Sequence, residues 1–390
     1  MRAGPAPRAL DRAGPGRGSC RGLDGVETED ALGPRRTRRI AMAWMIYGAN
    51  GYTGRLVAEL ALSRGERPVL AGRDAEKIAA FATPRGLPYR TFDLSDPDAV
   101  DAGLRDIEVV AHCAGPFSAT SAPVVEGCLR GGVHYVDITG EIDVFEAVFA
   151  RHEDARRAGV VLLPGAGFDV VPTDCLAAMV AAALPDATQL DLAFQAGGGI
   201  SRGTLKSALE GAAMGGKARI DGEIRTVPMG WRSREVPFPS AQRRVTSLPW
   251  GDVSSAYRST GIPNITTFAH LPGLDKAGKW SGLGQRILGL PIVQRLGKAA
   301  IDTFVSGPGP RRRAGSWSEV FAEATDASGR SASAALITPN TYDFTADSVL
   351  RVISGLQAGE VEAGAHTPST AFGADFVRRL HATKVIEPAR

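Results

Sequence analysis

Apolar and polar positions alternate in a regular series of short and long segments between residues 42 and 184. Short apolar runs, typical of buried parallel strands, are each followed by a longer segment with helical character. The predicted strands are 44–47, 68–71, 89–92, 108–113, 134–138 and 160–163, and the predicted helices are 55–62, 74–81, 97–104, 122–130, 144–158 and 172–184. This order predicts an α/β fold, a Rossmann-type doubly wound parallel sheet that forms a nucleotide-binding domain over 42–184.

The pattern changes after residue 184. An inserted α+β second domain, for substrate or dimer contacts, is predicted over 185–344, and the last residues, 345–390, are expected to return to the Rossmann domain. The elements expected in these two parts are a strand at 189–195, an antiparallel sheet with long loops within 217–270, a hairpin of 317–324 and 331–338, and helices at 345–356 and 371–381.

Residues 1–41 are rich in Arg, Gly, Ala and Pro and show no periodicity, so we expect a disordered extension. Its acidic residues argue against a mitochondrial presequence, and a start at Met42 or Met45 would begin the chain immediately before the first strand. Nine Arg and five acidic residues fall in the first 40 positions, whereas the whole chain has a net charge of +3. The basic character belongs to this extension, which argues against a body that binds nucleic acid.

The four cysteines, at Cys20, Cys113, Cys128 and Cys175, form no Cys-x-x-Cys pair, and the six histidines are scattered. The sequence predicts neither a metal site nor a disulfide framework, which fits a reducing cytoplasm. No apolar run reaches the ~18 residues of a transmembrane helix. We expect a cytoplasmic protein, with association at the inner face of the plasma membrane as the alternative.

A glycine-rich turn follows the first predicted strand. Gly48 would allow the tight turn, Gly51 would let a pyrophosphate approach the backbone, and Gly54 would let the next helix lie close to the sheet. The N-terminus of that helix offers free N–H groups and a positive dipole end to phosphates. The residues expected to bind the cofactor here are Gly48, Asn50, Gly51, Tyr52, Thr53 and Gly54. The alternative is an ordinary turn from strand to helix.

Arg73 follows the second strand, where an NAD site would carry Asp or Glu for the ribose 2′-hydroxyl. Its planar guanidinium matches a phosphate instead, so we expect NADP(H) unless Arg73 is only a solvent-exposed loop residue. After the third strand, Asp93 is expected either beside the adenine or as the cap of the next helix. After the fourth strand, three small residues would leave room for the nicotinamide ribose: Ala114, Gly115 and Pro116.

Polar side chains follow the fifth and sixth strands at the same carboxyl edge, where ligands bind in open α/β sheets. The catalytic candidates are Tyr135, Thr139 and Asp169. A hydroxyl would donate to a developing oxyanion, and an acid would protonate the neighbouring carbon. Tyr135 could equally belong to the core, and Asp137 and Glu141 could simply cap the next helix.

Two later segments admit more than one interpretation. Ser201, Arg202 and Thr204, at a second glycine-rich loop, could bind an anionic or carbonyl group or could only cap a helix. The apolar segment from Trp280 to Phe304 could lie on a membrane surface or line an apolar tunnel. We favour packing against the domain core or in a homodimer interface for this segment.

These motifs together resemble the saccharopine dehydrogenase-like superfamily, and more narrowly its trans-acting enoyl reductase branch from actinobacteria. The stretches that carry the resemblance are 47–54, 71–73, 113–117, 135–141, 167–174, 201–204 and 367–373. The resemblance implies a Rossmann domain with an inserted α+β domain, NADP(H) as cofactor, and reduction of a lipid-linked or small polar substrate.

The function expected from the sequence is that of an NADPH-dependent oxidoreductase acting on the double bond of a lipid-type enoyl substrate. The alternatives are an amino-acid or imine reductase, as in saccharopine dehydrogenase, and a non-catalytic NADP-binding protein at a membrane surface. No Tyr is followed four residues later by Lys, so the catalytic pair of short-chain dehydrogenases is absent. A cluster of arginines for two amino-acid carboxylates is not recognisable either.

Overall fold

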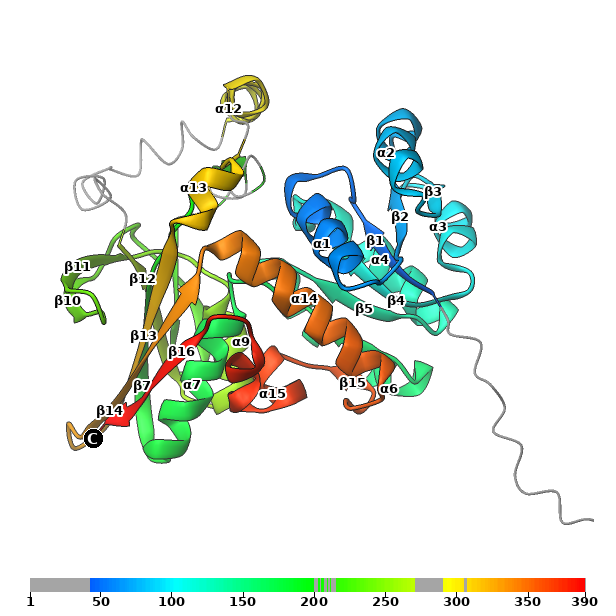
Figure 1. The fold of residues 1–390 in the computed structure, drawn as a ribbon. Helices are drawn as coiled ribbons and strands as arrows, with labels where there is room; N and C mark the ends of the chain where they lie inside the picture. The colour runs from blue at the N-terminus through cyan, green and yellow to red at the C-terminus, as the bar shows by residue number, and fades with distance from the viewer. Residues whose placement is uncertain are drawn as a thin grey trace, which may run out of the picture. The chain divides into compact units, whose positions relative to one another are not determined.

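Figure 1 shows a computed structural model of the chain, which describes residues 43–199, 203, 205, 206, 209, 211, 215–270, 290–304 and 307–389. The predicted disorder of 1–41 and the predicted roles of Ser201, Arg202 and Thr204 lie outside the described residues, as does the first part of the Trp280 to Phe304 segment.

The first sheet has seven strands in the order β15-β6-β5-β4-β1-β2-β3. Its strands are β1 (Ala43–Tyr47), β2 (Val69–Gly72), β3 (Tyr89–Thr91), β4 (Ile107–His112), β5 (His134–Asp137), β6 (Val161–Leu163) and β15 (Gly364–Ala365). Every pairing is parallel. The chain leaves β1 on one side toward β2 and returns on the other as β4, so ligands are expected at the carboxyl ends of β1 and β4. The predicted doubly wound parallel sheet is confirmed.

Six helices connect these strands: α1 (Tyr52–Ser63), α2 (Ala75–Ala82), α3 (Pro97–Leu104), α4 (Phe117–Gly131), α5 (Ile142–Phe149) and α6 (His152–Ala158). A short 3₁₀ turn, η1 (Thr83–Arg85), follows α2. The helix predicted at 144–158 is divided at Arg151, where an apolar sequence gives way to a charged one. The helix predicted from residue 122 begins at Phe117, because Glu141, in the loop between β5 and α5, caps its N-terminus.

The second sheet has nine strands, and its main path runs β10-β11-β12-β7-β13-β14-β16. Its strands are β7 (Ala187–Gln195), β8 (Gly216–Ile220), β9 (Glu223–Val227), β10 (Ser233–Pro237), β11 (Gln242–Ser247), β12 (Asn264–Ala269), β13 (Trp317–Asp326), β14 (Ser331–Pro339) and β16 (Lys384–Ala389). Only β7 and β12 pair in parallel, whereas the other pairs are antiparallel. The predicted hairpin is β13 with β14.

Further helices in the described ranges include α7 (Val171–Ala183), α9 (Asp252–Thr260), α12 (Pro291–Phe304), α13 (Pro310–Ala314), α14 (Thr341–Gln357), α15 (Pro368–Phe372) and the 3₁₀ turn η2 (Ala374–Arg379). By its contacts, α7 belongs with β13, β14 and α9 rather than with the first sheet. The domain boundary after residue 184 stays a prediction.

The end of the chain serves both sheets. β15 extends the first sheet and α14 packs against α1, so part of the C-terminal segment lies against the Rossmann domain. The prediction of one helix at 371–381 is wrong, because the chain forms α15 and the 3₁₀ turn η2 there. The chain then continues as β16, which pairs with β14 of the second sheet. The sequence from Lys384 to Ala389 alternates weakly, so only its pairing with β14 defines it as a strand.

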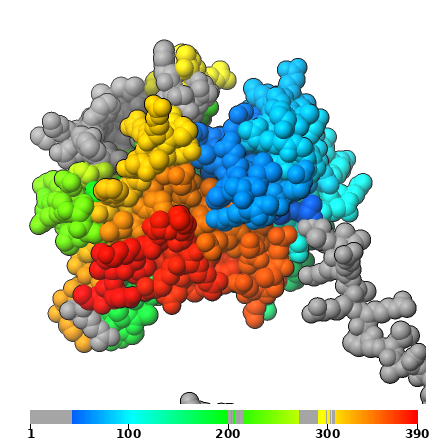
Figure 2. Space-filling model, viewed as in Figure 1, coloured from blue at the N-terminus to red at the C-terminus, as the bar shows by residue number. Residues whose placement is uncertain are grey.

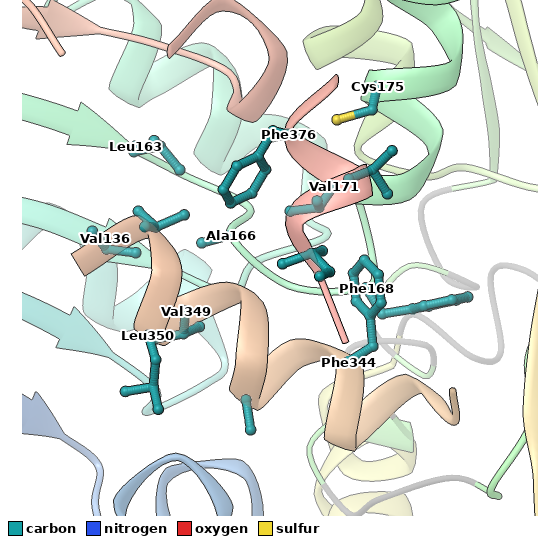
Figure 3. Close-up of a cluster of buried hydrophobic side chains, with 14 of the residues drawn as sticks. Val136, Leu163, Ala166, Phe168, Val171, Cys175, Phe344, Val349, Leu350 and Phe376 are labelled. Atoms are coloured by element: carbon teal, nitrogen blue, oxygen red, sulfur yellow. The ribbon is translucent and has the colours of Figure 1, made fainter. Parts of the chain in front are cut away.

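One apolar core joins the two sheets through α14. Figure 3 shows Phe344, Val349 and Leu350 of this helix among residues from the ends of β5 and β6. The ring of Phe344 meets that of Phe168 edge-on, with centroids 5.8 Å apart. Since α14 packs on both α1 and β14, its apolar face links the nucleotide-binding sheet to the second sheet.

The amphipathic helix α12 carries the described part of the apolar segment. Ile292 and Leu296 lie four residues apart and are 60% and 64% exposed. Gly297 instead packs against the side chain of Leu209, and a Cβ on it would lie 2.6 Å from that side chain. Contact with a membrane or a second copy stays a prediction for this face. No helix in the described ranges is long and apolar enough to cross a membrane.

Truncating Phe344 tests the shared core. Phe344→Ala should lower the free energy of unfolding by ~3–5 kcal/mol, because the ring is 1% exposed and its removal leaves a cavity. Chemical denaturation measures this value. Tyr89→Ala, at a ring that is 46% exposed, is the control and should cost far less. Equal stability losses in the two variants would contradict a core that depends on α14.

Candidate functional site

The glycine-rich turn after β1 is packed so tightly that larger residues would not fit. Gly48 has a φ of +84°, and a Cβ there would lie 2.8 Å from the Cβ of Ala114. A Cβ on Gly54 would collide with the carbonyl oxygen of Gly48. The N–H of Gly48 donates to the carbonyl of Ala71 at 2.8 Å, which anchors the turn to β2. The glycines thus bring the first turn of α1 against the ends of β1 and β4.

The N-terminus of α1 is left open for an anion. Its capping position is Gly51, no side chain caps it, and its first turn carries no acidic residue. The backbone carbonyl of Asn50 accepts from Arg55, and the Asn50 side chain reaches toward Gly72. Thr53 lies in the first turn. An uncapped helix start of this kind, approached through glycines, fits a pyrophosphate.

Arg73 and Asp93 extend from the ends of β2 and β3, and both are exposed. Asp93 accepts from the N–H and hydroxyl of Ser95 at 2.8 and 2.7 Å, and these bonds, with a smaller contribution from Arg73, lower its pKa. Asp93 therefore caps its own loop while its charge stays near Arg73. No ion pair is formed by Arg73 with any described residue, so its guanidinium can meet a 2′-phosphate.

The loop after β4 is held by its neighbours. The Thr120 hydroxyl lies 2.7 Å from the carbonyl oxygen of Ala114 and 3.0 Å from that of Pro116, which fixes the backbone around Gly115. The carboxylate of Glu141 accepts the N–H groups that open α4, at 3.0 and 2.7 Å. Glu141 therefore caps the preceding helix rather than the next one. Gly115 itself is exposed at this edge, as a nicotinamide-binding residue must be.

A buried carboxylate joins the loops after β5 and β6. Asp137 accepts hydrogen bonds from the Tyr135 hydroxyl at 2.7 Å, from Thr139 N–H at 2.9 Å and from Gly165 N–H at 2.8 Å. Burial raises the Asp137 pKa to about 6, although these donors favour the charged form. The role expected for Asp137, capping of the next helix, is wrong, since its partners lie in two strand-end loops.

The same geometry speaks against two of the three predicted catalytic residues. Tyr135 and Thr139 have no exposed surface. The Tyr135 hydroxyl donates to Asp137, and the Thr139 hydroxyl accepts from Glu141 N–H at 3.0 Å. Burial and the neighbouring carboxylate raise the Tyr135 pKa well above its usual value. Neither group can reach a ligand without the loops opening, so their role is to hold the site.

Asp169 is placed differently. It lies half-buried after β6, and a Cβ on Gly140 would sit 3.6 Å from one of its carboxylate oxygens. Its backbone carbonyl accepts the indole N–H of Trp250 at 2.6 Å. Burial raises the Asp169 pKa to about 7, which keeps a substantial fraction of the side chain protonated near neutral pH. Of the three predicted catalytic residues, Asp169 is the one whose geometry suits proton donation.

Sequence reasoning missed three residues from other parts of the chain. Trp250 reaches Asp169 from the segment before α9, Arg313 donates to the Tyr52 hydroxyl at 3.0 Å, and Asp252 lies fully buried beside α7. Burial raises the pKa of Asp252 well above its usual value. None is marked by a local motif, because each gains its position only through packing between distant segments.

Comparison with known protein families supports a dinucleotide site in the first sheet. Residues 44–163 match the family profile of the saccharopine dehydrogenase NADP-binding domain. The match covers the first six strands of the parallel sheet and the helices between them. The resemblance and the cofactor expected from the sequence are thereby confirmed, and the cofactor of the NADP-binding domain is NADP(H). When bound, this cofactor supplies the two electrons of a reduction.

Two curated relatives resemble the chain over part of its length. A trans-acting enoyl reductase of Mycobacterium leprae is 35% identical over 138 residues, covering 33% of each chain. A saccharopine dehydrogenase-like oxidoreductase of Mus musculus is 31% identical over 150 residues, covering 33% of this chain and 35% of the relative. The matched region spans less than half of these relatives.

A solved structure extends the likeness beyond the NADP-binding domain. Apo saccharopine dehydrogenase of Saccharomyces cerevisiae superposes with a TM-score of 0.58, covering 88% of this chain and all of the other, at 12% identity. At this identity the likeness concerns the fold alone. It supports the predicted architecture of a Rossmann domain followed by a second sheet.

Arg73 should determine the preference for NADPH. A charge-assisted contact with the 2′-phosphate is worth roughly 1.5–3 kcal/mol, so NADPH should bind at least ~10-fold more tightly than NADH. Calorimetric titration of Arg73→Ala should show that this preference is lost while NADH affinity is unchanged. The control is Arg105→Ala. Arg105 lies between the end of α3 and the start of β4, so it is at the amino ends of the strands, away from the expected cofactor site. If Arg73→Ala still preferred NADPH over NADH, Arg73 would not bind the 2′-phosphate.

Proposed function

We propose that this protein is an NADPH-dependent oxidoreductase that reduces the double bond of a lipid-type enoyl thioester. The observation that carries the proposal is the half-buried Asp169, whose pKa is raised to about 7. It lies at the carboxyl edge of the first sheet, which also carries the glycine-rich turn after β1, called the phosphate turn below. The names of the mycobacterial relatives favour an enoyl substrate. Because the likeness covers part of each relative, the activity and the substrate are both proposals.

Each part of the chain has a role in this reaction. Gly48, Gly51 and Gly54 hold the pyrophosphate, and Arg73 holds the 2′-phosphate. The exposed backbone at Gly115 bounds the nicotinamide. These residues position the cofactor relative to the substrate.

Asp169 donates a proton to the carbon next to the one that accepts the hydride, and this proton completes reduction of the double bond. A general acid works best when its pKa lies near the working pH, and burial has moved this carboxyl there. The fixed backbone around Asp169 keeps the side chain beside Gly140, since Trp250 holds the Asp169 carbonyl. After donation, the carboxylate must regain a proton from solvent before the next turnover.

An amino-acid or imine substrate is a weaker candidate. On the second sheet, the two arginines of the β10 region are already paired and are not available to the carboxylates of such a substrate. Arg232 and Arg234 contact Asp191 at 3.2 and 2.7 Å, and Arg234 also contacts Glu323 at 2.6 Å. The second sheet uses these cations to satisfy its own carboxylates.

The activity is tested by following NADPH oxidation with 2-enoyl thioesters of increasing chain length. We expect turnover that rises with chain length and a saturated thioester as product, identified by mass spectrometry. Oxidation with imine mixtures alone would favour the amino-acid reductase instead. NADPH binding without oxidation of any of these substrates would favour a non-catalytic NADP-binding protein.

Replacing the acid gives a sharper prediction. In the wild type, kcat should fall as the pH rises above about 7, because ionised Asp169 cannot donate. Asp169→Asn should lower kcat by ~10²–10⁴-fold and abolish this pH dependence while NADPH affinity is kept. Asp143→Asn, at an exposed acid in the first turn of α5, is the matched control. A normal kcat in Asp169→Asn would contradict the role of Asp169.

A further inference from the structure

The segment that opens with Gly307 packs directly on the phosphate turn. The hydroxyl of Tyr52, the first residue of α1, donates to the carbonyl of Pro308 at 2.6 Å. Gly307 has a φ of +79°, and a Cβ there would lie 2.9 Å from the ring of Tyr52. The backbone of this segment can therefore approach the ring closely only because residue 307 is glycine.

Arg313 fixes the other end of the segment. Its guanidinium donates to the Tyr52 hydroxyl at 3.0 Å and lies 3.2 Å from the carboxylate of Asp343. Its carbonyl accepts the side-chain amide of Asn340 at 3.2 Å, where α14 begins. With only 14% of its side chain exposed, Arg313 serves to attach α13 to α1 and α14.

Two further arginines of α13 are not used in this attachment. Arg311 and Arg312 are exposed, and neither forms an ion pair with any residue in the described ranges. A Cβ on Gly199 would lie 3.4 Å from the guanidinium of Arg312. The charge of Arg312 thus lies beside the loop after β7, on a short helix whose Arg313 contacts the start of α1. In Figure 2, the α13 region, drawn in yellow, adjoins the blue surface of the first sheet's helices.

We propose that Arg311 and Arg312 form a phosphate-binding pair at the rim of the cofactor site. Unpaired guanidiniums present planar donor sets that match phosphate oxygens, and their field attracts anions. The phosphate belongs either to the dinucleotide or to a phosphopantetheine-type carrier of the acyl substrate. The carrier source rests on the proposed function, whereas the phosphate-binding pair itself does not.

Binding measurements on the full chain separate these two sources. NADPH is titrated into each variant by calorimetry, and coenzyme A is titrated into protein saturated with NADP⁺. Arg311→Ala/Arg312→Ala should lose ~10-fold or more in affinity for one of the two probes, with a weaker salt dependence. Arg311→Lys/Arg312→Lys should recover only part of the loss, because lysine lacks the planar fork. Arg105→Ala should behave like the wild type, and circular dichroism verifies that every variant is folded.

The outcomes are distinct. A loss confined to coenzyme A assigns the pair to the carrier phosphate, and a loss confined to NADPH assigns it to the dinucleotide. Unchanged affinity for both probes in the folded double alanine variant overturns the proposal. Because titration involves no turnover, a protein that reduces no enoyl thioester but loses NADPH affinity in this variant would refute the proposed function and retain the phosphate-binding pair.

Discussion

The arrangement of the candidate site depends on one buried carboxylate, that of Asp137. It is the common acceptor for N–H groups from the loops after β5 and β6, so it sets how these loops lie relative to each other. Without it, the buried N–H groups of Thr139 and Gly165 would lose their partners, at a cost of ~1–3 kcal/mol each. The Tyr135 hydroxyl completes its hydrogen bonds. This network places Asp169 at the sheet edge.

The two sheets contribute differently to the site. The first sheet supplies the phosphate turn, the strand-end loops and the acid, as parallel sheets do at their carboxyl edge. The second sheet and its helices supply side chains that secure these parts, such as Trp250 on the Asp169 carbonyl and Arg313 on Tyr52. Because α14 packs on both sheets, the mutual position of these groups is built into one apolar core.

Local patterns in the sequence were sufficient for most of the first sheet. Strands such as β1 and β6 are apolar runs, and the turn after β1 needs glycine at positions that the packing shows to be crowded, as at Gly48. The short strand β15 was not predicted, because only its pairing with β6 defines it. The strand β16 and the packing of α7 could not be read in this way, since only distant partners define them. Tyr135 lies within β5 and is fully buried, whereas Asp169 follows β6 and is partly exposed. This difference in burial depends on the whole fold and could not be predicted from local sequence.

We propose that NADPH binds at this edge with its nicotinamide beside Asp169, and a crystal structure of the NADP⁺ complex would test this placement. We expect a pyrophosphate on the turn from Gly48 to Gly54, and a nicotinamide over Gly115 with the Asp169 carboxyl facing its reactive carbon. A dinucleotide bound in this way, but with Asp169 covered by protein and turned from the nicotinamide, would contradict the proposed chemistry. A dinucleotide bound elsewhere would contradict the site itself.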